Sequence, residues 1–159
     1  MKQSPIDKDL AKNLGPSKFS AEGFLGNDQR PLDEIIADDM RTLDKMGLSL
    51  EQIGRALRAV YEAARNSLGA EEEIRPGVIA VFYEARGRIP SPFRDGTSFE
   101  KGEVVVRDLA SGQELVLTSL GIALIEKYGF FQGKGSRYRI DPAVAAQVLG
   151  LGEGRRRDL

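Results

Sequence analysis

The sequence has no cysteine and no histidine among its 159 residues. Without cysteine the chain can form no disulfide, no thiolate metal site and no cysteine nucleophile. Without histidine it lacks the commonest general base and the imidazole ligands of metal centres. Apolar runs are short, since none approaches the roughly 18 residues that span a bilayer. We therefore expect a cytoplasmic protein with no membrane contact, cofactor or metal, and the composition favours a non-enzymatic role.

The chain also lacks a strong charge of one sign, because its formal net charge is only −1. Hydrophobic residues make up 41% and charged residues 30%, which is typical of a folded globular protein. The charge is uneven, since residues 31–75 carry ten acids and six bases, whereas residues 115–159 carry seven bases and four acids. A basic C-terminal face that meets an anion is one interpretation, and ordinary solvated surface is the other.

Two segments within residues 31–75 have the apolar spacing of amphipathic helices. Gly47 can end the first helix, and Ser49 can cap the second, with Gln52 completing a capping box. Gly69 can end the second helix. The short connection between the two helices predicts a helical hairpin.

The composition changes after the hairpin, where β-forming residues and turn signals alternate. Val78–Tyr83 is apolar at every position, which predicts a strand covered on both sides. Two further strands, Glu103–Asp108 and Glu114–Thr118, flank a short turn and predict a β-hairpin. Helices are expected at Leu120–Tyr128 and at Pro142–Leu149.

These elements predict an α+β fold, in which an N-terminal two-helix hairpin precedes a small antiparallel sheet with one or two short helices. The predicted organisation is a flexible N-terminal segment (1–30), the helical hairpin (31–75), an α+β domain with a C-terminal hairpin (76–150) and a basic tail (151–159).

One stretch combines aromatic, glycine and basic residues more tightly than any other: Gly129-Phe130-Phe131-Gln132-Gly133-Lys134-Gly135-Ser136-Arg137-Tyr138-Arg139-Ile140. We expect it to be a second β-hairpin that folds at Gly133-Lys134-Gly135. It is not a phosphate-binding P-loop, because only three residues separate Gly129 from Gly133 and a glycine follows Lys134.

The cations of this stretch form the candidate anion-binding site. If Tyr138 faces the core, strand alternation points Arg137 and Arg139 to solvent together, beside Lys134. Paired guanidinium groups suit phosphates and carboxylates. Three arginines around a Pro-Ser-Pro segment could support them. The predicted anion- or nucleic-acid-binding residues are Lys134, Arg137, Arg139, Arg86, Arg88 and Arg94. The simpler interpretation is a strand edge protected by charge.

Two resemblances accompany these residues. Gly-Arg-Ile-Pro at 87–90, followed by Gly-Phe-Phe-x-Gly-x-Gly-Ser-x-Tyr-Arg-x-Asp-Pro at 129–142, resembles a family of small bacterial cytosolic proteins of unknown activity. Leu124 to Pro142 is similar to the wing of winged-helix DNA-binding domains, which implies contact with DNA. The chain departs from that pattern, because strands are expected where such a domain has its first two helices.

Three classes of function stay open. The leading hypothesis is a non-enzymatic binding module that contacts nucleic acid or another polyanion, such as an acidic protein, through the basic glycine-rich hairpin. The alternative is homodimerisation through the apolar stripes of the helical hairpin. A carboxylate metal enzyme is the third, because acids cluster at Asp38, Asp39 and Asp44 and at Glu71–Glu73.

Overall fold

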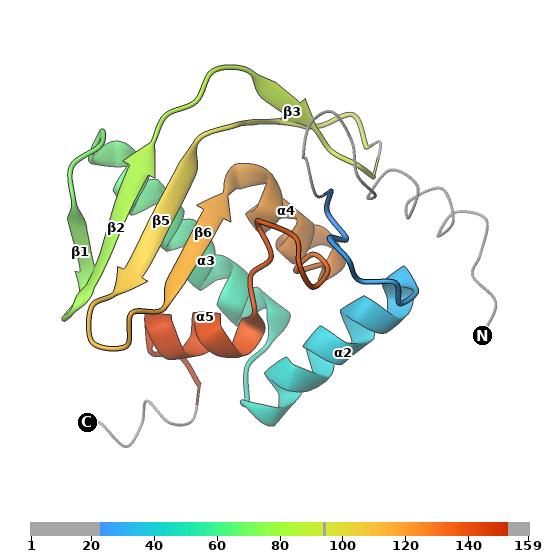
Figure 1. The fold of residues 1–159 in the computed structure, drawn as a ribbon. Helices are drawn as coiled ribbons and strands as arrows, with labels where there is room; N and C mark the ends of the chain where they lie inside the picture. The colour runs from blue at the N-terminus through green and yellow to red at the C-terminus, as the bar shows by residue number, and fades with distance from the viewer. Residues whose placement is uncertain (1–22, 94, 153–159) are drawn as a thin grey trace.

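The computed structural model describes residues 23–93 and 95–152, and it has an α+β fold (Figure 1). Two helices precede a four-stranded antiparallel sheet, and a two-stranded ribbon and two shorter helices complete the fold. Residues 1–22 and 153–159, which include most of the predicted flexible segment and basic tail, lie outside the described residues. The elements are α2 (Leu32–Lys45), α3 (Leu50–Asn66), β1 (Glu72–Arg75), β2 (Val78–Tyr83), β3 (Arg88–Pro90), β4 (Ser98–Glu100), β5 (Glu103–Asp108), β6 (Glu114–Thr118), α4 (Ser119–Tyr128) and α5 (Pro142–Leu149).

Most helices begin at the capping residues that the sequence offers. The Ser49 hydroxyl accepts a hydrogen bond from the Gln52 backbone N–H, and the Gln52 side chain accepts one from the Ser49 N–H. Thr118 caps α4 and Asp141 caps α5 with their side-chain oxygens. The end of α3 differs from the prediction, because this helix stops before it reaches Gly69.

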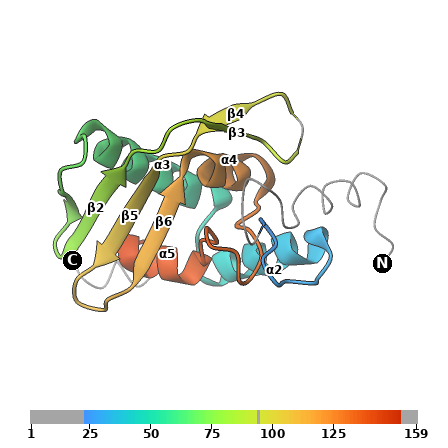
Figure 2. The same ribbon diagram turned by 45° about the horizontal axis from the view of Figure 1, so that its top comes forward.

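The four-stranded sheet has the order β1-β2-β5-β6, and each neighbouring pair is antiparallel (Figures 1 and 2). The predicted strands β2, β5 and β6 are confirmed, as is the hairpin between β5 and β6. Strand β1 was not predicted, and it lies at the end of the segment assigned to the helical hairpin, where Glu71–Glu73 form an acidic cluster. A short, charged strand of this kind is a common way to protect a sheet edge.

Only one face of the sheet is covered by the described helices. Side chains that alternate onto the inner face are buried against α3, α4 and α5: Val78, Ala80, Val104, Val106, Leu115 and Leu117. Ile79, Val81, Val105 and Val116 alternate onto the outer face and stay partly exposed. In Figure 1, α3 runs behind the sheet. The prediction that β2 is covered on both sides is therefore wrong for the part of the chain that the structure describes.

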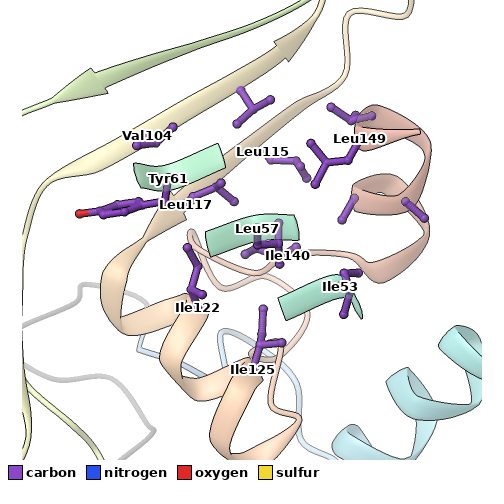
Figure 3. Packing of buried hydrophobic residues seen from close by; sticks show 14 of the residues in the cluster. Ile53, Leu57, Tyr61, Val104, Leu115, Leu117, Ile122, Ile125, Ile140 and Leu149 are labelled. Carbon is purple, nitrogen blue, oxygen red and sulfur yellow. The ribbon is translucent and has the colours of Figure 1, made fainter. Parts of the chain in front are cut away.

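The helical hairpin and the sheet share one hydrophobic core (Figure 3). Ile53, Leu57 and Tyr61 of α3 pack in the same cluster as the inner face of the sheet, together with Ile140. Leu43 of α2 is buried in the same cluster. The apolar stripes on which the hairpin-dimer hypothesis depended are thus buried within the chain itself.

A second cluster joins α2 and α4 to the β3–β4 ribbon. Phe24, Ile35, Leu124 and Phe130 are buried in it, and Ile89 of the ribbon packs against them. This cluster holds the ribbon beside α4, and it ties the segment before α2 to the residues that follow α4.

The stretch from Phe130 to Ile140 is a loop with two turns, so the β-hairpin predicted there is wrong. The loop closes at its base, where the Ile140 N–H donates to the Phe131 carbonyl at 3.2 Å. Without a strand at this place, the resemblance to a winged-helix wing has no structural counterpart in the described residues. We call residues 129–140 the glycine loop.

The glycine loop also forms backbone hydrogen bonds with an earlier part of the chain. The Gly133 N–H donates to the Phe24 carbonyl at 2.8 Å, and the Lys134 carbonyl accepts from the Asn27 N–H at 3.0 Å. Because buried backbone groups need partners, these bonds replace those that a hairpin would form across its strands. Residues 23–30, which were predicted to be flexible, are held against the loop in this way.

Candidate functional site

Glycines in the loop allow two backbones to meet closely. A Cβ on Gly133 would lie 2.2 Å from the Leu25 carbonyl oxygen, and one on Gly26 would lie 2.2 Å from the Ser136 nitrogen. Neither position can hold a side chain without displacement of the backbone. These two glycines are therefore required by the close approach of residues 25–26 to the glycine loop.

Arg139 does not point outward. Its Nη1 and Nη2 each donate to the Asp39 carboxylate at 2.9 Å, and Nη1 also donates to the Gln132 carbonyl at 2.6 Å. The Arg139 and Asp39 side chains are only 13% and 5% exposed. Burial opposes the charge on Arg139, yet the hydrogen bond with Asp39 keeps the pKa of its guanidinium above the usual value. Arg139 ties the glycine loop to α2, so the predicted outward pair of arginines is not formed.

Arg137 and Lys134 have different surroundings. The Arg137 side chain is 65% exposed, and its Nη2 lies 3.7 Å from Glu103 Oε1. Its guanidinium carbon lies 5.1 Å from the centre of the Tyr138 ring. Lys134, by contrast, is held beside the segment before α2, because its backbone N–H donates to the Asp28 carboxylate at 3.1 Å.

The three ribbon arginines also differ in their surroundings. Arg88 is tied across the ribbon, since Nε donates to Ser98 Oγ at 2.9 Å and Nη2 donates to the Ser98 carbonyl at 2.7 Å. Arg86 is exposed. Arg94 lies outside the described residues. Of the predicted cations that the structure describes, Arg137 is exposed and contacts two residues, Glu103 and Tyr138, of the cleft described next. Arg86 and Arg88 are chain neighbours of Ala85 and Ile89, which also line that cleft.

A cleft of about 200 Å³ lies between the β3–β4 ribbon, the start of β5, the end of β6 and the glycine loop. Its lining mixes apolar and polar side chains from five separate parts of the chain: Phe24, Ala85, Ile89, Glu100, Lys101, Glu103, Thr118, Leu120, Gln132 and Tyr138. Arg137 contacts two of these residues, because it lies near the Glu103 carboxylate and beside the Tyr138 ring. Arg86 follows Ala85 directly. Pockets of this mixed kind, with few convergent polar groups, are typical of ligand sites.

Gln132 is an unusual residue in the wall of the cleft. It has a φ of 72°, a left-handed conformation that costs a residue other than glycine about 1–3 kcal/mol. The residue is 2% exposed, and its Oε1 accepts a hydrogen bond from the Ser136 hydroxyl at 2.7 Å. The backbone carbonyl of Gln132 accepts a further hydrogen bond from the Arg139 guanidinium. Such strain persists only where the surroundings enforce it, and it gathers at functional sites.

The two acids of the cleft are both compensated. Glu103 accepts a hydrogen bond from the Tyr138 hydroxyl, and burial together with this bond raises the pKa of Tyr138 to about 12. Glu100 accepts from Arg65 Nε at 2.7 Å and from the Tyr61 hydroxyl at 2.6 Å. The hydrogen bond from Arg65 lowers the pKa of Glu100 below its usual value. Lys101 therefore adds a positive charge to a lining whose carboxylates already have partners.

Two of the acids considered as metal ligands, Asp38 and Asp39, form ion pairs with arginines. Asp38 pairs with Arg30 at 3.0 Å and with Arg41 at 3.2 Å, and Asp39 holds Arg139. Within residues 23–93 and 95–152 there is no group of three or more acids that could hold a metal ion. In the same ranges, no helix has the length and apolar character needed to cross a membrane.

Sequence reasoning missed Lys101, Gln132 and the role of Tyr138 at the cleft. One indication for Gln132 lay in the sequence, where it is a polar residue between two phenylalanines and a glycine. The structure shows that all four of these residues are buried. Lys101 offered none, since it lies on a short connection and only the fold brings it opposite the glycine loop.

Comparison with family models, with curated proteins and with solved structures finds no match for this chain. The functional interpretation therefore depends on the cleft, on its strained residue and on the charges at its edge.

Proposed function

We propose that the protein is a non-enzymatic binding module for single-stranded nucleic acid, with the cleft beside the glycine loop as its binding site. The observation that carries the proposal is the wall of this cleft. There, the buried Gln132 is held in a strained conformation, Lys101 lines the same cleft, and Arg137 contacts two of the lining residues.

The size of the cleft favours one unit of a polymer over a whole cofactor. Pockets for drug-sized ligands have volumes of about 300–1,000 Å³. The cleft has about 200 Å³, which suits a single planar ring. A nucleic acid could place one unstacked base there and leave its backbone outside.

The chemistry of the lining suits such a base. The Tyr138 ring and the apolar Phe24 and Leu120 offer surfaces for stacking and packing, which are largely independent of sequence. The Gln132 side chain carries an amide, a group that reads base edges in single strands, and since its Oε1 already accepts from the Ser136 hydroxyl, its Nε2 is the group we expect to bind the base.

Cations at the edge of the cleft suit the backbone of the same ligand. Lys101 lines the cleft, and the Gly87 backbone lies beside it, since a Cβ on Gly87 would be 3.7 Å from Lys101 Nζ. Arg137 is held on the Tyr138 ring with most of its side chain exposed. Arg86 lies in the chain between Ala85, which lines the cleft, and Gly87. Phosphate contacts of this kind position a strand and make its affinity depend on salt.

The direct test is fluorescence anisotropy with labelled single-stranded RNA and DNA of mixed sequence, at low and high salt. Lys101→Ala and Arg137→Ala should each weaken binding, and each should lower the salt slope by about 0.7 for a lost phosphate contact. Lys45→Ala and Arg55→Ala, which remove exposed cations of α2 and α3, are the matched controls. If wild-type protein gives no anisotropy change at low salt, or if the controls weaken binding equally, the proposal is wrong.

A second variant separates binding from folding. Gln132→Gly relieves the left-handed strain of about 1–3 kcal/mol, and it leaves the buried Ser136 hydroxyl without its acceptor at a cost of about 1–3 kcal/mol. Because the two effects oppose each other, we expect only a small net change in stability. Affinity should nevertheless fall. Competition with polyglutamate identifies the rival ligand, because an acidic polypeptide that displaces the nucleic acid and binds more tightly would assign the site to an acidic protein instead.

A further inference from the structure

A second groove, of about 440 Å³, lies between the C-terminal end of α3 and the end of β2. Three large apolar side chains of residues 23–93 and 95–152 are exposed, and two of them, Leu68 and Tyr83, line this groove. Leu68 is 88% exposed and Tyr83 is 56% exposed. Exposed apolar side chains that gather at a groove are typical of a site where another molecule binds.

Leu68 has an unfavourable backbone conformation. It follows the C-terminal end of α3 with a φ of 51°, the left-handed conformation that helix ends normally give to glycine or asparagine. Glycine is available one position later, at Gly69, yet the chain has a leucine in this place. Because the Leu68 side chain is almost fully exposed, packing within the described residues does not explain the leucine.

The end of β2 has an open edge beside this groove. Strand β1 pairs with β2 only as far as Ala80, so no strand of the described residues pairs with Val81–Tyr83 on that side (Figure 1). On the opposite side, the Gly77 carbonyl accepts a hydrogen bond from the Leu109 N–H. Alternate residues of an antiparallel strand bond to opposite neighbours. Phe82, an odd number of positions from Gly77, therefore turns its backbone N–H and C=O to the open side.

The charges around the groove favour a basic ligand. Arg65, which lines the groove, is paired with Glu100 at 2.7 Å. Glu84 also lines the groove, and Glu71 and Glu73 are exposed at the start of β1. None of these last three acids forms an ion pair with another described residue. Such carboxylates attract cationic side chains and repel phosphates, so they disfavour nucleic acid at this groove.

We propose that the groove binds an extended segment of a partner protein, in which lysine or arginine alternates with apolar residues. The segment adds as a short strand to the open edge of β2, where its backbone bonds to Phe82. Its apolar side chains cover Leu68 and Tyr83, and its cations meet Glu84. Main-chain bonds to an open sheet edge give such segments their affinity, and the side chains beside the edge give specificity.

Fluorescence anisotropy with a labelled six-residue peptide that alternates lysine and valine tests the proposal. Wild-type protein should bind this peptide, and a peptide that alternates glutamate and valine should bind about tenfold more weakly or worse. If wild-type protein leaves the anisotropy of the lysine peptide unchanged, or binds both peptides equally, the proposal is wrong.

Two N-methylated versions of the lysine peptide test the addition of a strand. One version carries methyl groups on its odd-numbered amides, and the other carries them on its even-numbered amides. Only alternate amides of an added strand bond to the sheet edge. One version should therefore lose about tenfold in affinity or more, while the other binds like the parent peptide. Equal affinities of the two versions would show that no strand is added.

Leu68→Gly separates docking from folding. Glycine accepts the left-handed conformation, so the melting temperature should rise by about 2–4 °C. Peptide affinity should nevertheless fall by about tenfold, because the apolar side chain is lost. The matched control is Leu109→Ala, which truncates the third exposed apolar side chain, in the turn between β5 and β6, and should bind the peptide like wild type. A Leu68→Gly variant that also binds like wild type would overturn the proposal.

A charge reversal tests the choice of a basic ligand. Glu84→Lys should weaken binding of the lysine peptide, whereas Asp44→Lys, which reverses an exposed acid of α2, should not. Equal losses in the two variants would contradict a specific contact with Glu84. Leu68→Gly should leave nucleic-acid binding at the cleft unchanged, so failure of this groove and failure of the cleft are distinguishable.

Discussion

Replacement of Arg139 by methionine tests the view that this residue is an internal tie and not part of a surface clamp. The substitution keeps much of the aliphatic stem and removes the guanidinium. It leaves the Asp39 carboxylate, which is 5% exposed, without its cation, and it leaves the carbonyl of the strained Gln132 without a donor. Removal of one partner from a buried ion pair costs about 3–5 kcal/mol.

The expected loss is large compared with the total stability of a domain of this size, which is about 5–15 kcal/mol. A loss of about 4 kcal/mol corresponds to a fall of about 10 °C in the melting temperature. Urea denaturation followed by circular dichroism measures the free energy of unfolding directly. Arg55→Met is the matched control, because Arg55 and its partner Glu51 are 75% and 76% exposed and such pairs contribute about 1 kcal/mol or less.

The double variant Asp39→Leu/Arg139→Met separates the ion pair from its burial. Because a buried pair is often replaced by apolar side chains at little cost, the double variant should recover much of the stability that Arg139→Met loses. If Arg139→Met unfolds at the same urea concentration as Arg55→Met, the arginine is not buried in solution. The outward clamp would then return as the better explanation.

Two further predictions concern the same loop. Gly133→Ala forces a Cβ to within 2.2 Å of the Leu25 carbonyl oxygen, so it should lower the free energy of unfolding by about 2–3 kcal/mol and speed hydrogen exchange of the Asn27 amide. Gly112→Ala, whose Cβ would meet no atom within 4 Å, should cost only the roughly 1–2 kcal/mol of its left-handed backbone, and an equal loss in both variants would contradict this account. Burial and the bond to Glu103 raise the pKa of Tyr138 from 10.0 to about 12, so its stabilisation is complete below pH 10 and is lost as the pH rises toward 12. Tyr138→Phe should therefore show a smaller loss of stability across that alkaline range, measured by urea denaturation at each pH.

Local signals in the sequence were sufficient for most of the regular elements. The Ser49 cap, the period of α3 and the strands of the β5–β6 hairpin depend on neighbouring residues, and each was predicted close to its observed place. The ribbon strands β3 and β4 were missed, because a three-residue strand gives too short a pattern and is formed only when the second core cluster holds it against α4.

The candidate site shows the opposite case. A basic, glycine-rich stretch gave a reasonable prediction of an exposed cationic hairpin, since alternation placed Arg137 and Arg139 on one side. The loop has no strand, however, and Asp39 on α2 draws Arg139 inward over a hundred positions of sequence. Periodicity carries no information about such distant partners.

The sequence by itself determined the α+β class, the helix caps and the apolar stripes of the two long helices, because those depend on interactions within a few residues of each position. Tertiary structure decided which glycines are needed, which cations stay exposed and which face of the sheet stays open. Gly133 is required by the approach of Leu25, and Lys101 reaches the cleft because the ribbon folds back over α4. These outcomes depend on packing between distant segments, which only the folded chain brings into contact.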